Sequence, residues 1–356
     1  MADTTYRQIV RTSLGGKALR ITLSNEFGTE PLHIAAASVA LVNGQDGTVK
    51  QARSVTFSGA SAIVIPPGAL VMSDRVPLEV TGLSKLAVDL FIPAQTITLL
   101  SRHHDAFQTN YEADGDQTGV AALEKPRPYT QWNFLKGIDV EAPAGSGAIV
   151  ILGDSITDGN GSTANASARW TDVLAERLQA NPQTRHLGLL NEGISGNRLL
   201  RDQGGMDALA RFDRDVLSQS GVRYLVILEG INDIGHIDRP AFPSDTVTAD
   251  DLTFALTQLV ERAHTHGIRV ILCTLPPYPG KGAAAPQMVA LQQEENAWIR
   301  KNTTLDGVID FYALTHDPEH PSSLLPVDDS GDHLHPGNAG YKAMGDGIDL
   351  HLFTHK

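Results

Sequence analysis

Residues 149–159, which read IVILGDSITDG, decide the fold of the second half of the chain. The apolar run 149–152 is mostly β-branched and ends at Gly153, after which polar residues continue to Gly159. Uniform apolarity over so short a run indicates a strand buried on both faces, as in a parallel sheet. The stretch therefore predicts a buried strand that ends at a sheet edge, with Ser155 in the turn that follows.

Comparable strands recur after residue 145 and alternate with helical patterns. They are HLGLLNEG (186–193), YLVILEG (224–230), IRVILCT (268–274) and GVIDFY (307–312). Between two of them, residues 248–267 predict a helix that Thr248 and Asp251 cap, that has an apolar face and that Gly267 ends. This alternation predicts a doubly wound parallel sheet in three α/β/α layers over residues 146–356.

Residues 1–145 follow a period of two instead. Short strand-like stretches are separated by Gly, Pro, Asn or Asp about every ten residues. The stretches are ALRITLSNEFG (18–28), AASVALV (36–42), SVTFSG (54–59), SAIVIPPG (61–68), RVPLEV (75–80) and KLAVDLFIP (85–93). The pattern predicts an all-β sandwich or jelly-roll accessory domain, with the boundary to the second domain near residue 145.

The composition narrows the classes of function. The chain has 28 basic and 41 acidic residues and a formal charge of −13, so we expect no nucleic-acid partner. Its one cysteine, Cys273, allows no intramolecular disulfide, and no apolar run approaches the roughly 18 to 20 residues that span a bilayer. The first residues show no signal peptide; we expect a cytoplasmic protein, or an exported one if the chain is a mature form. The oligomeric state stays open.

Polar, glycine-containing turns follow several of the predicted parallel strands. They are GDSITDG (153–159), NEGISGN (191–197), EGIND (229–233) and, after the fifth strand, DDSGDHLHPGNAGY (328–341). Ligands of open parallel sheets bind beyond the carboxyl ends of the strands, so we expect the four segments to meet there.

These segments hold the groups that a serine nucleophile requires. Ser155 supplies the hydroxyl, His335 is the candidate base, and Asp332 lies three residues before it, within reach of the imidazole. Gly196, through its backbone N–H, and Asn232, through its amide, are candidate donors to an oxyanion, together with the Ser155 N–H.

GDSITDG, NEGISGN, GIND and DHLHP resemble the four blocks of the GDSL, or SGNH, hydrolase family, in their usual order. The resemblance implies a flavodoxin-like hydrolase domain with Ser155 as nucleophile, His335 as base and Asp332 behind it. It implies an oxyanion hole made by Ser155, Gly196 and Asn232, and neither cofactor nor metal.

The resemblance extends over nearly the whole chain. YRQIVRTSLGGKALRITLSNEFG (6–28), QTNYEADGD (108–116) and the stretch from DGVIDFYALTHDP (306–318) to GYKAMGDGIDL (340–350) are similar to bacterial two-domain members with a β-rich N-terminal domain. Those members usually carry a leader and a further stretch before the region of residues 6–13, which leaves localisation open.

We expect a serine esterase that hydrolyses short-chain, acetyl-type esters of small molecules or carbohydrates. One alternative is a lysophospholipase or thioesterase for longer acyl chains, and another is a glycan-binding protein with a vestigial hydrolase fold. Locally, Ser155 could be only a helix N-cap, and Asp332, His333 and His335 could bind a metal ion. Asp154 is expected to brace the turn, and Glu229 and Asp233 are expected to be structural.

Overall fold

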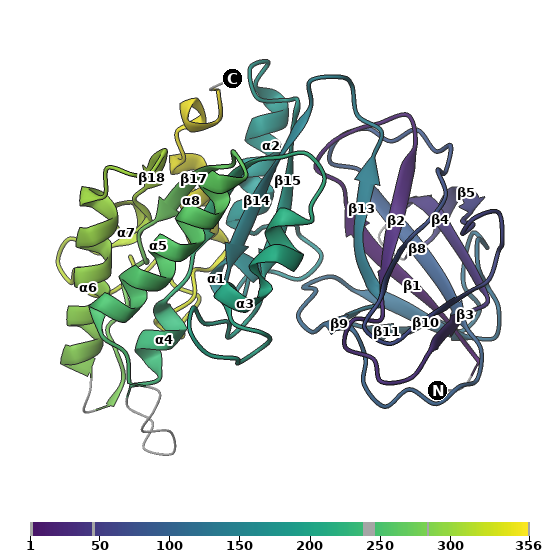
Figure 1. Cartoon of the computed structure of the whole chain (residues 1–356), viewed down its shortest axis with the longest axis horizontal. Helices are drawn as coiled ribbons and strands as arrows, with labels where there is room; N and C mark the ends of the chain where they lie inside the picture. The colour runs from purple at the N-terminus through teal and green to yellow at the C-terminus, as the bar shows by residue number, and fades with distance from the viewer. Residues whose placement is uncertain (1–2, 45–46, 238–245, 283–284, 355–356) are drawn as a thin grey trace. The chain divides into compact units, whose positions relative to one another are not determined.

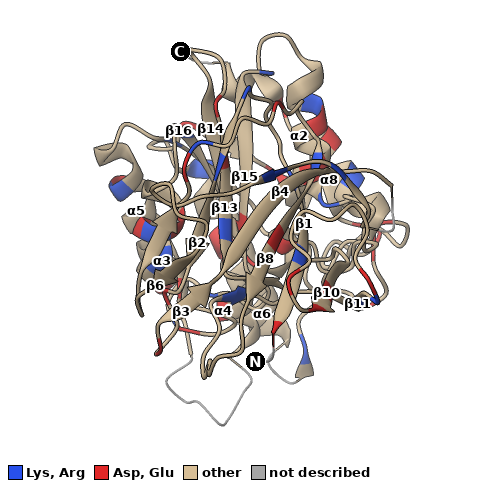
Figure 2. Cartoon of the chain, turned by 90° about the vertical axis from the view of Figure 1, so that its right-hand side faces the viewer, with Lys and Arg blue, Asp and Glu red and all other residues tan. Residues whose placement is uncertain are grey.

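The computed structural model of the chain describes residues 3–44, 47–237, 246–282 and 285–354. The chain divides into two compact units, Met1–Gly145 and Ser146–Lys356 (Figure 1). Basic and acidic positions are interspersed along the strands and helices (Figure 2). Within the described ranges, no helix is both long and apolar enough to cross a membrane.

The first unit is antiparallel. Its main sheet has the order β11-β10-β1-β8-β4-β5, a second has the order β13-β2-β7, and two pairs, β12-β9 and β3-β6, complete it. The strands are β1 (Thr4–Arg11), β2 (Leu19–Ser24), β3 (Leu32–Ile34), β4 (Ala36–Val42), β5 (Val49–Ser54), β6 (Ile63–Ile65), β7 (Leu70–Met72), β8 (Lys85–Ile92), β9 (Arg102–His103), β10 (Asn110–Asp114), β11 (Arg127–Tyr129), β12 (Trp132–Asn133) and β13 (Leu135–Val140).

One core joins the two larger sheets of this unit. Ile21 and Leu23 of β2 pack in the same buried cluster as Val88 and Leu90 of β8. Because side chains from two sheets meet in one core, the unit is a β-sandwich, as the sequence predicted.

Two of the strand predictions in this unit are wrong. Residues 75–80 form only single bridges at Val76 and Val80, since Pro77 between them cannot donate to a ladder. Residues 54–59 lie mostly beyond the end of β5, where Ser58 and Gly59 take positive φ values in a turn.

The second unit contains a five-stranded parallel sheet of order β15-β14-β16-β17-β18. Its strands are β14 (Gly147–Gly153), β15 (Leu187–Gly193), β16 (Val222–Leu228), β17 (Arg269–Cys273) and β18 (Gly307–Ile309). This is the doubly wound, flavodoxin-like order, and all five strands correspond to predicted apolar stretches.

Helices cover the sheet in two groups. α2 packs on α8, whereas α5 packs on both α3 and α6 (Figure 1). The helices are α1 (Ser155–Asp158), α2 (Trp170–Ala180), α3 (Ala208–Phe212), α4 (Ile231–Gly235), α5 (Ala249–Thr265), α6 (Ala285–Lys301), α7 (Phe311–Thr315) and α8 (Asn338–Gly347), with a π-helical turn at Asp213–Leu217 and a 3-10 turn at Leu350–Phe353. The arrangement is the predicted three-layer α/β/α sandwich.

Sequence features account for these elements. Every residue of β14 is buried, as expected of a central parallel strand. Thr248 and Asp251 form the predicted capping box at the start of α5, and the predicted apolar face of that helix is buried. Cys273 is buried in β17.

Candidate active site

The turn after β14 places Ser155 at the point where the strand order reverses, since β15 lies on one side of β14 and β16 on the other. Asp154 is the N-cap of the short helix α1, and its Oδ1 accepts the Ile156 N–H at 2.8 Å. Gly159 ends α1 with a φ of 109°. Ser155 is therefore the first helical residue and not the cap, and Asp154 braces the turn as predicted.

Ser155, His335 and Asp332 form one chain of hydrogen bonds. The Ser155 Oγ lies 2.8 Å from the His335 Nε2, and the His335 Nδ1 lies 2.5 Å from the Asp332 Oδ2. The serine and histidine are buried, whereas about half of the Asp332 side chain is exposed. The structure thus brings together the three residues that the sequence singled out as nucleophile, base and orienting group.

The loop that carries the histidine is held by its own hydrogen bonds. Asp332 Oδ1 accepts the N–H groups of Leu334 and His335, at 2.9 and 2.8 Å. The Ser330 N–H donates to the His335 carbonyl at 3.0 Å. Partial burial alone would raise the pKa of Asp332, but the hydrogen bonds from His335 and Leu334 outweigh it and lower that pKa to about 2. Asp332 is thus an anion that accepts from the imidazole.

The loop that contains Gly196 is hydrogen-bonded both to the serine turn and to Asn232. Ser195 donates its N–H and its hydroxyl to Asp158 Oδ2 of α1, at 3.0 and 2.7 Å. Gly196 follows with a φ of 80°, a conformation that favours glycine. Asn232, in α4, donates through Nδ2 to the Asn197 carbonyl at 2.8 Å, which leaves the second amide hydrogen for another acceptor.

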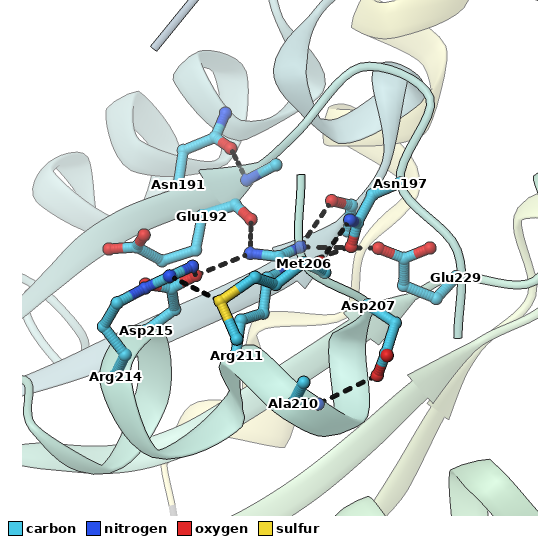
Figure 3. A network of polar contacts seen from close by, with 12 residues as sticks. Asn191, Glu192, Asn197, Met206, Asp207, Ala210, Arg211, Arg214, Asp215 and Glu229 are labelled. Atoms are coloured by element: carbon cyan, nitrogen blue, oxygen red, sulfur yellow. Dashed lines mark hydrogen bonds and ion pairs between the residues drawn. The ribbon is translucent and has the colours of Figure 1, made fainter. Parts of the chain in front are cut away.

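Arg211, which sequence reasoning missed, connects the ends of three strands (Figure 3). Its fully buried guanidinium donates to the Gly153 carbonyl at 3.0 Å, the Glu192 carbonyl at 2.7 Å and Asn197 Oδ1 at 2.9 Å. It also meets the carboxylates of Asp215 at 3.1 Å and Glu229 at 3.4 Å. Because α3 has only five residues, nothing in the local sequence marks this arginine as buried.

The two acidic residues around the third turn differ in their contacts. Asp233 accepts the N–H groups of Leu199 and Leu200 at 2.8 and 3.2 Å, and so fastens α4 to the neighbouring loop. Burial raises the pKa of Asp233 to about 6, although these hydrogen bonds act to lower it. Glu229 contacts Arg211 through one oxygen only. The contacts of Asp233 are those expected of a structural residue.

The other histidine of the loop points to a different carboxylate. His333 has a φ of 64°, and its Nδ1 lies 2.7 Å from Asp329 Oδ2, whereas His335 contacts Asp332. In the described part of the chain, no group of three or more His, Cys, Asp or Glu side chains is placed to hold a metal ion.

Comparisons with known proteins identify a family for this chain. The sequence profile described as the GDSL-like Lipase/Acylhydrolase family matches residues 151–343. No curated protein matches the chain.

Several solved structures are similar in fold. A catalytic mutant of an acetylxylan esterase from Geobacillus stearothermophilus has 25% identity and a TM-score of 0.46, over 60% of this chain and 96% of that one. An α/β hydrolase from the metagenome of Lake Arreo has 25% identity and a TM-score of 0.44, over 60% and 98%. A GDSL-like lipase from Bacteroides thetaiotaomicron has 21% identity and a TM-score of 0.42, over 58% and 87%.

The family profile spans more than half of the chain and includes every residue of the candidate site. The chain is a carboxylic ester hydrolase and belongs to the GDSL-like lipase/acylhydrolase family.

Proposed function

We propose that this esterase acts through a Ser-His-Asp triad and an acyl-enzyme, with Ser155 as nucleophile, His335 as base and Asp332 as the group that orients the imidazole. The continuous hydrogen-bond chain from Ser155 Oγ through His335 to Asp332 carries the proposal. A serine hydroxyl is a weak nucleophile until a positioned base accepts its proton, and this chain supplies that base.

The reaction proceeds in two halves. In the first, Oγ of Ser155 attacks the ester carbonyl carbon while His335 Nε2 takes the hydroxyl proton, and the alcohol leaves with that proton. In the second, water attacks the acyl-serine carbonyl, His335 takes a proton from the water and returns it to Oγ, and the carboxylic acid is released. Asp332 stabilises the imidazolium that forms in each half.

The oxyanion of each tetrahedral intermediate needs donors that are already in place. The N–H groups of Ser155 and Gly196 and the amide of Asn232 would supply them. The hydrogen bonds from Ser195 to Asp158 and from Asn232 to the Asn197 carbonyl support this assignment, because they tie the loop of Gly196 to both the serine turn and α4.

We further propose a short acyl group, acetyl in particular, carried by a small alcohol or a carbohydrate. The residues that flank the candidate donor Gly196 in the chain, Ser195 and Asn197, are short and polar, and they provide little apolar surface for a long acyl chain.

A chain-length series tests both parts of the proposal. Wild-type protein and Ser155→Ala are assayed on p-nitrophenyl acetate, butyrate, octanoate and decanoate, and on acetylated sugars. We expect the acetate to react fastest, and we expect Ser155→Ala to lose activity on every ester. Equal rates for the variant would overturn the triad, and faster cleavage of the octanoate or decanoate would favour the lysophospholipase or thioesterase alternative.

A further inference from the structure

Three buried carboxyl groups lie in or against the turns that follow β14 and β16, and the proposed mechanism uses none of them. Asp154, Glu229 and Glu295 are each at most 2% exposed. Among the described residues, Asp154 Oδ2, Glu229 Oε2 and both carboxyl oxygens of Glu295 have no donor partner. A buried carboxylate oxygen without a donor is costly, so these groups require an explanation.

The backbone places the three groups together. Gly153 and Leu228 are register partners in β14 and β16, so Asp154 and Glu229 follow them at the same edge of the sheet. Glu295, on α6, brings its carboxyl group against the next residue of the third turn, because a Cβ at Gly230 would lie 2.7 Å from Oε2 and 2.8 Å from Oε1. Gly230 also has a φ of 121°, so both space and conformation require glycine there.

Two buried guanidinium groups, of Arg198 and Arg211, lie in this region. Arg211 meets Glu229 and Asp215, and Arg198 lies 3.7 Å from Asp233. The charged groups that act on Asp154 are Asp233, Arg211 and Asp158. The charges of Asp154, Arg211 and Asp233 act on Glu229, and the charges of Asp233 and Asp154 act on Glu295. The buried acids therefore outnumber the guanidinium groups that face them.

Burial and mutual repulsion both favour neutral carboxyl groups here. Burial, followed by the charge of Asp154, raises the pKa of Glu229 well above its ordinary value. Burial, followed by the charges of Asp233 and Asp154, likewise raises the pKa of Glu295. For Asp154, burial outweighs the hydrogen bond from Ile156 and raises the pKa to about 7.

We propose that Glu229 and Glu295 are held as neutral carboxylic acids which, with Asp154, form a proton-sharing cluster that positions the catalytic turns. A protonated carboxyl group donates one hydrogen bond, so it can satisfy an oxygen that has no N–H donor. Asp154 caps α1 beside Ser155, and Glu229 and Glu295 flank the start of α4, which carries Asn232. All three are positioning residues, a role that rests on the proposed function.

Equilibrium unfolding tests the protonation without reference to catalysis. A glutamic acid whose pKa is raised in the folded protein keeps a proton that the unfolded chain releases above about pH 4.5, so it lowers stability as the pH rises. The urea midpoints of the whole chain, Glu229→Gln and Glu295→Gln are measured from pH 5 to pH 8. We expect the free energy of unfolding of each variant to fall less steeply with rising pH than that of wild type. The difference in slope should correspond to about one bound proton, so each variant gains stability relative to wild type.

Asp310→Asn is the matched control. Asp310 is paired with Arg300 at 2.8 Å, and the hydrogen bonds from Arg300 and Thr274 outweigh burial and lower the pKa of Asp310. Its neutralisation should therefore lower the urea midpoint at pH 8. If the glutamine variants behave like this control, show no pH-dependent gain, or fail to fold at pH 8, the proposal is overturned. Infrared spectra add a test on the wild-type protein, where the absence of protonated-carboxyl absorption at pH 8 would also overturn it.

The positioning role has its own measurement. Glu295→Gln can still donate and accept a hydrogen bond at this place, whereas Glu295→Ala can do neither. We expect the alanine variant to have a kcat about tenfold below that of the glutamine variant, with similar KM, because the turn that carries Asn232 would lose its support. Equal kcat values would refute the positioning role. Failure of the triad itself would appear separately, as an active Ser155→Ala.

Discussion

The Ser155 Oγ and the His335 Nε2 lie 2.8 Å apart, although 180 positions separate the two residues in the chain. Two contacts between the residues that follow Ser155 and those that follow His335 fasten the two segments. The Thr163 N–H donates to Asn338 Oδ1 at 2.9 Å, and the Tyr341 hydroxyl donates to the Asn160 carbonyl at 2.5 Å. The segment after α1 and the start of α8 are thus held together, close to the serine–histidine contact.

Substitutions of the two other triad members should separate their roles. We expect His335→Ala to lower kcat by about 10⁶-fold, and Asp332→Asn by about 10⁴-fold, with little change in KM, as in other triads where the base or its orienting carboxylate is removed. Steady-state kinetics on p-nitrophenyl acetate measure both. An Asp332→Asn variant with wild-type kcat would show that the half-exposed carboxylate does not orient His335.

Asn232→Ala tests the oxyanion assignment. Removal of one preorganised donor costs about 10²–10³-fold in kcat, so the variant should be impaired but still measurably active. KM should change little, because the donor acts on charge that develops in the transition state. A variant with unchanged kcat would exclude the amide of Asn232 from the oxyanion hole.

Stability in acid should report on Asp332. Its pKa is lowered from 3.8 to about 2 by hydrogen bonds that outweigh burial, so its contribution is complete above pH 3.8 and is lost as the pH falls toward 2. We expect the urea midpoints of wild type and Asp332→Asn to differ most above pH 5 and to converge near pH 2. A difference that does not vary with pH would contradict the assigned ionisation.

Arg211→Leu should be strongly destabilising. The substitution leaves the buried carboxylate of Asp215 without its Arg211 contact and removes the donors to the Gly153 and Glu192 carbonyls. Arg214 still pairs with Asp215, but the buried acids lose a compensating charge, so we expect a loss of about 3–5 kcal/mol in the free energy of unfolding. Arg211→Lys, which keeps the charge but not the planar fork, should lose less. A loss below about 1 kcal/mol in Arg211→Leu would refute the role given to this network.

The fold was largely predictable because its signals are local. The uniformly apolar run predicts the strand β14, and the capping box predicts the start of α5, each from a few neighbouring residues. The strand prediction for residues 75–80 is wrong because apolar and polar residues alternate there as in a strand, whereas Pro77 interrupts the hydrogen-bond ladder.

The candidate site was predictable only in part. Ser155, Asp332 and His335 lie in short motifs whose residue types match a known chemistry. Arg211 and Glu295 lie on helices that carry polar residues, and nothing nearby in the sequence separates their buried positions from solvent-facing ones. Arg211 and Glu295 contact the turns after β14 and β16, which are distant in the sequence and come close only when the chain folds.

Covalent labelling with a fluorophosphonate tests the central claim most directly, because the reagent marks an activated serine. Intact-mass measurement and peptide mapping should find one adduct, on the peptide that contains Ser155, in the wild-type protein and in the control Ser218→Ala, whose exposed hydroxyl binds the Arg214 carbonyl. Ser155→Ala should take up no label. An adduct on another residue, persistent labelling of Ser155→Ala, or no labelling of the wild-type protein would contradict the assignment of Ser155 as the nucleophile.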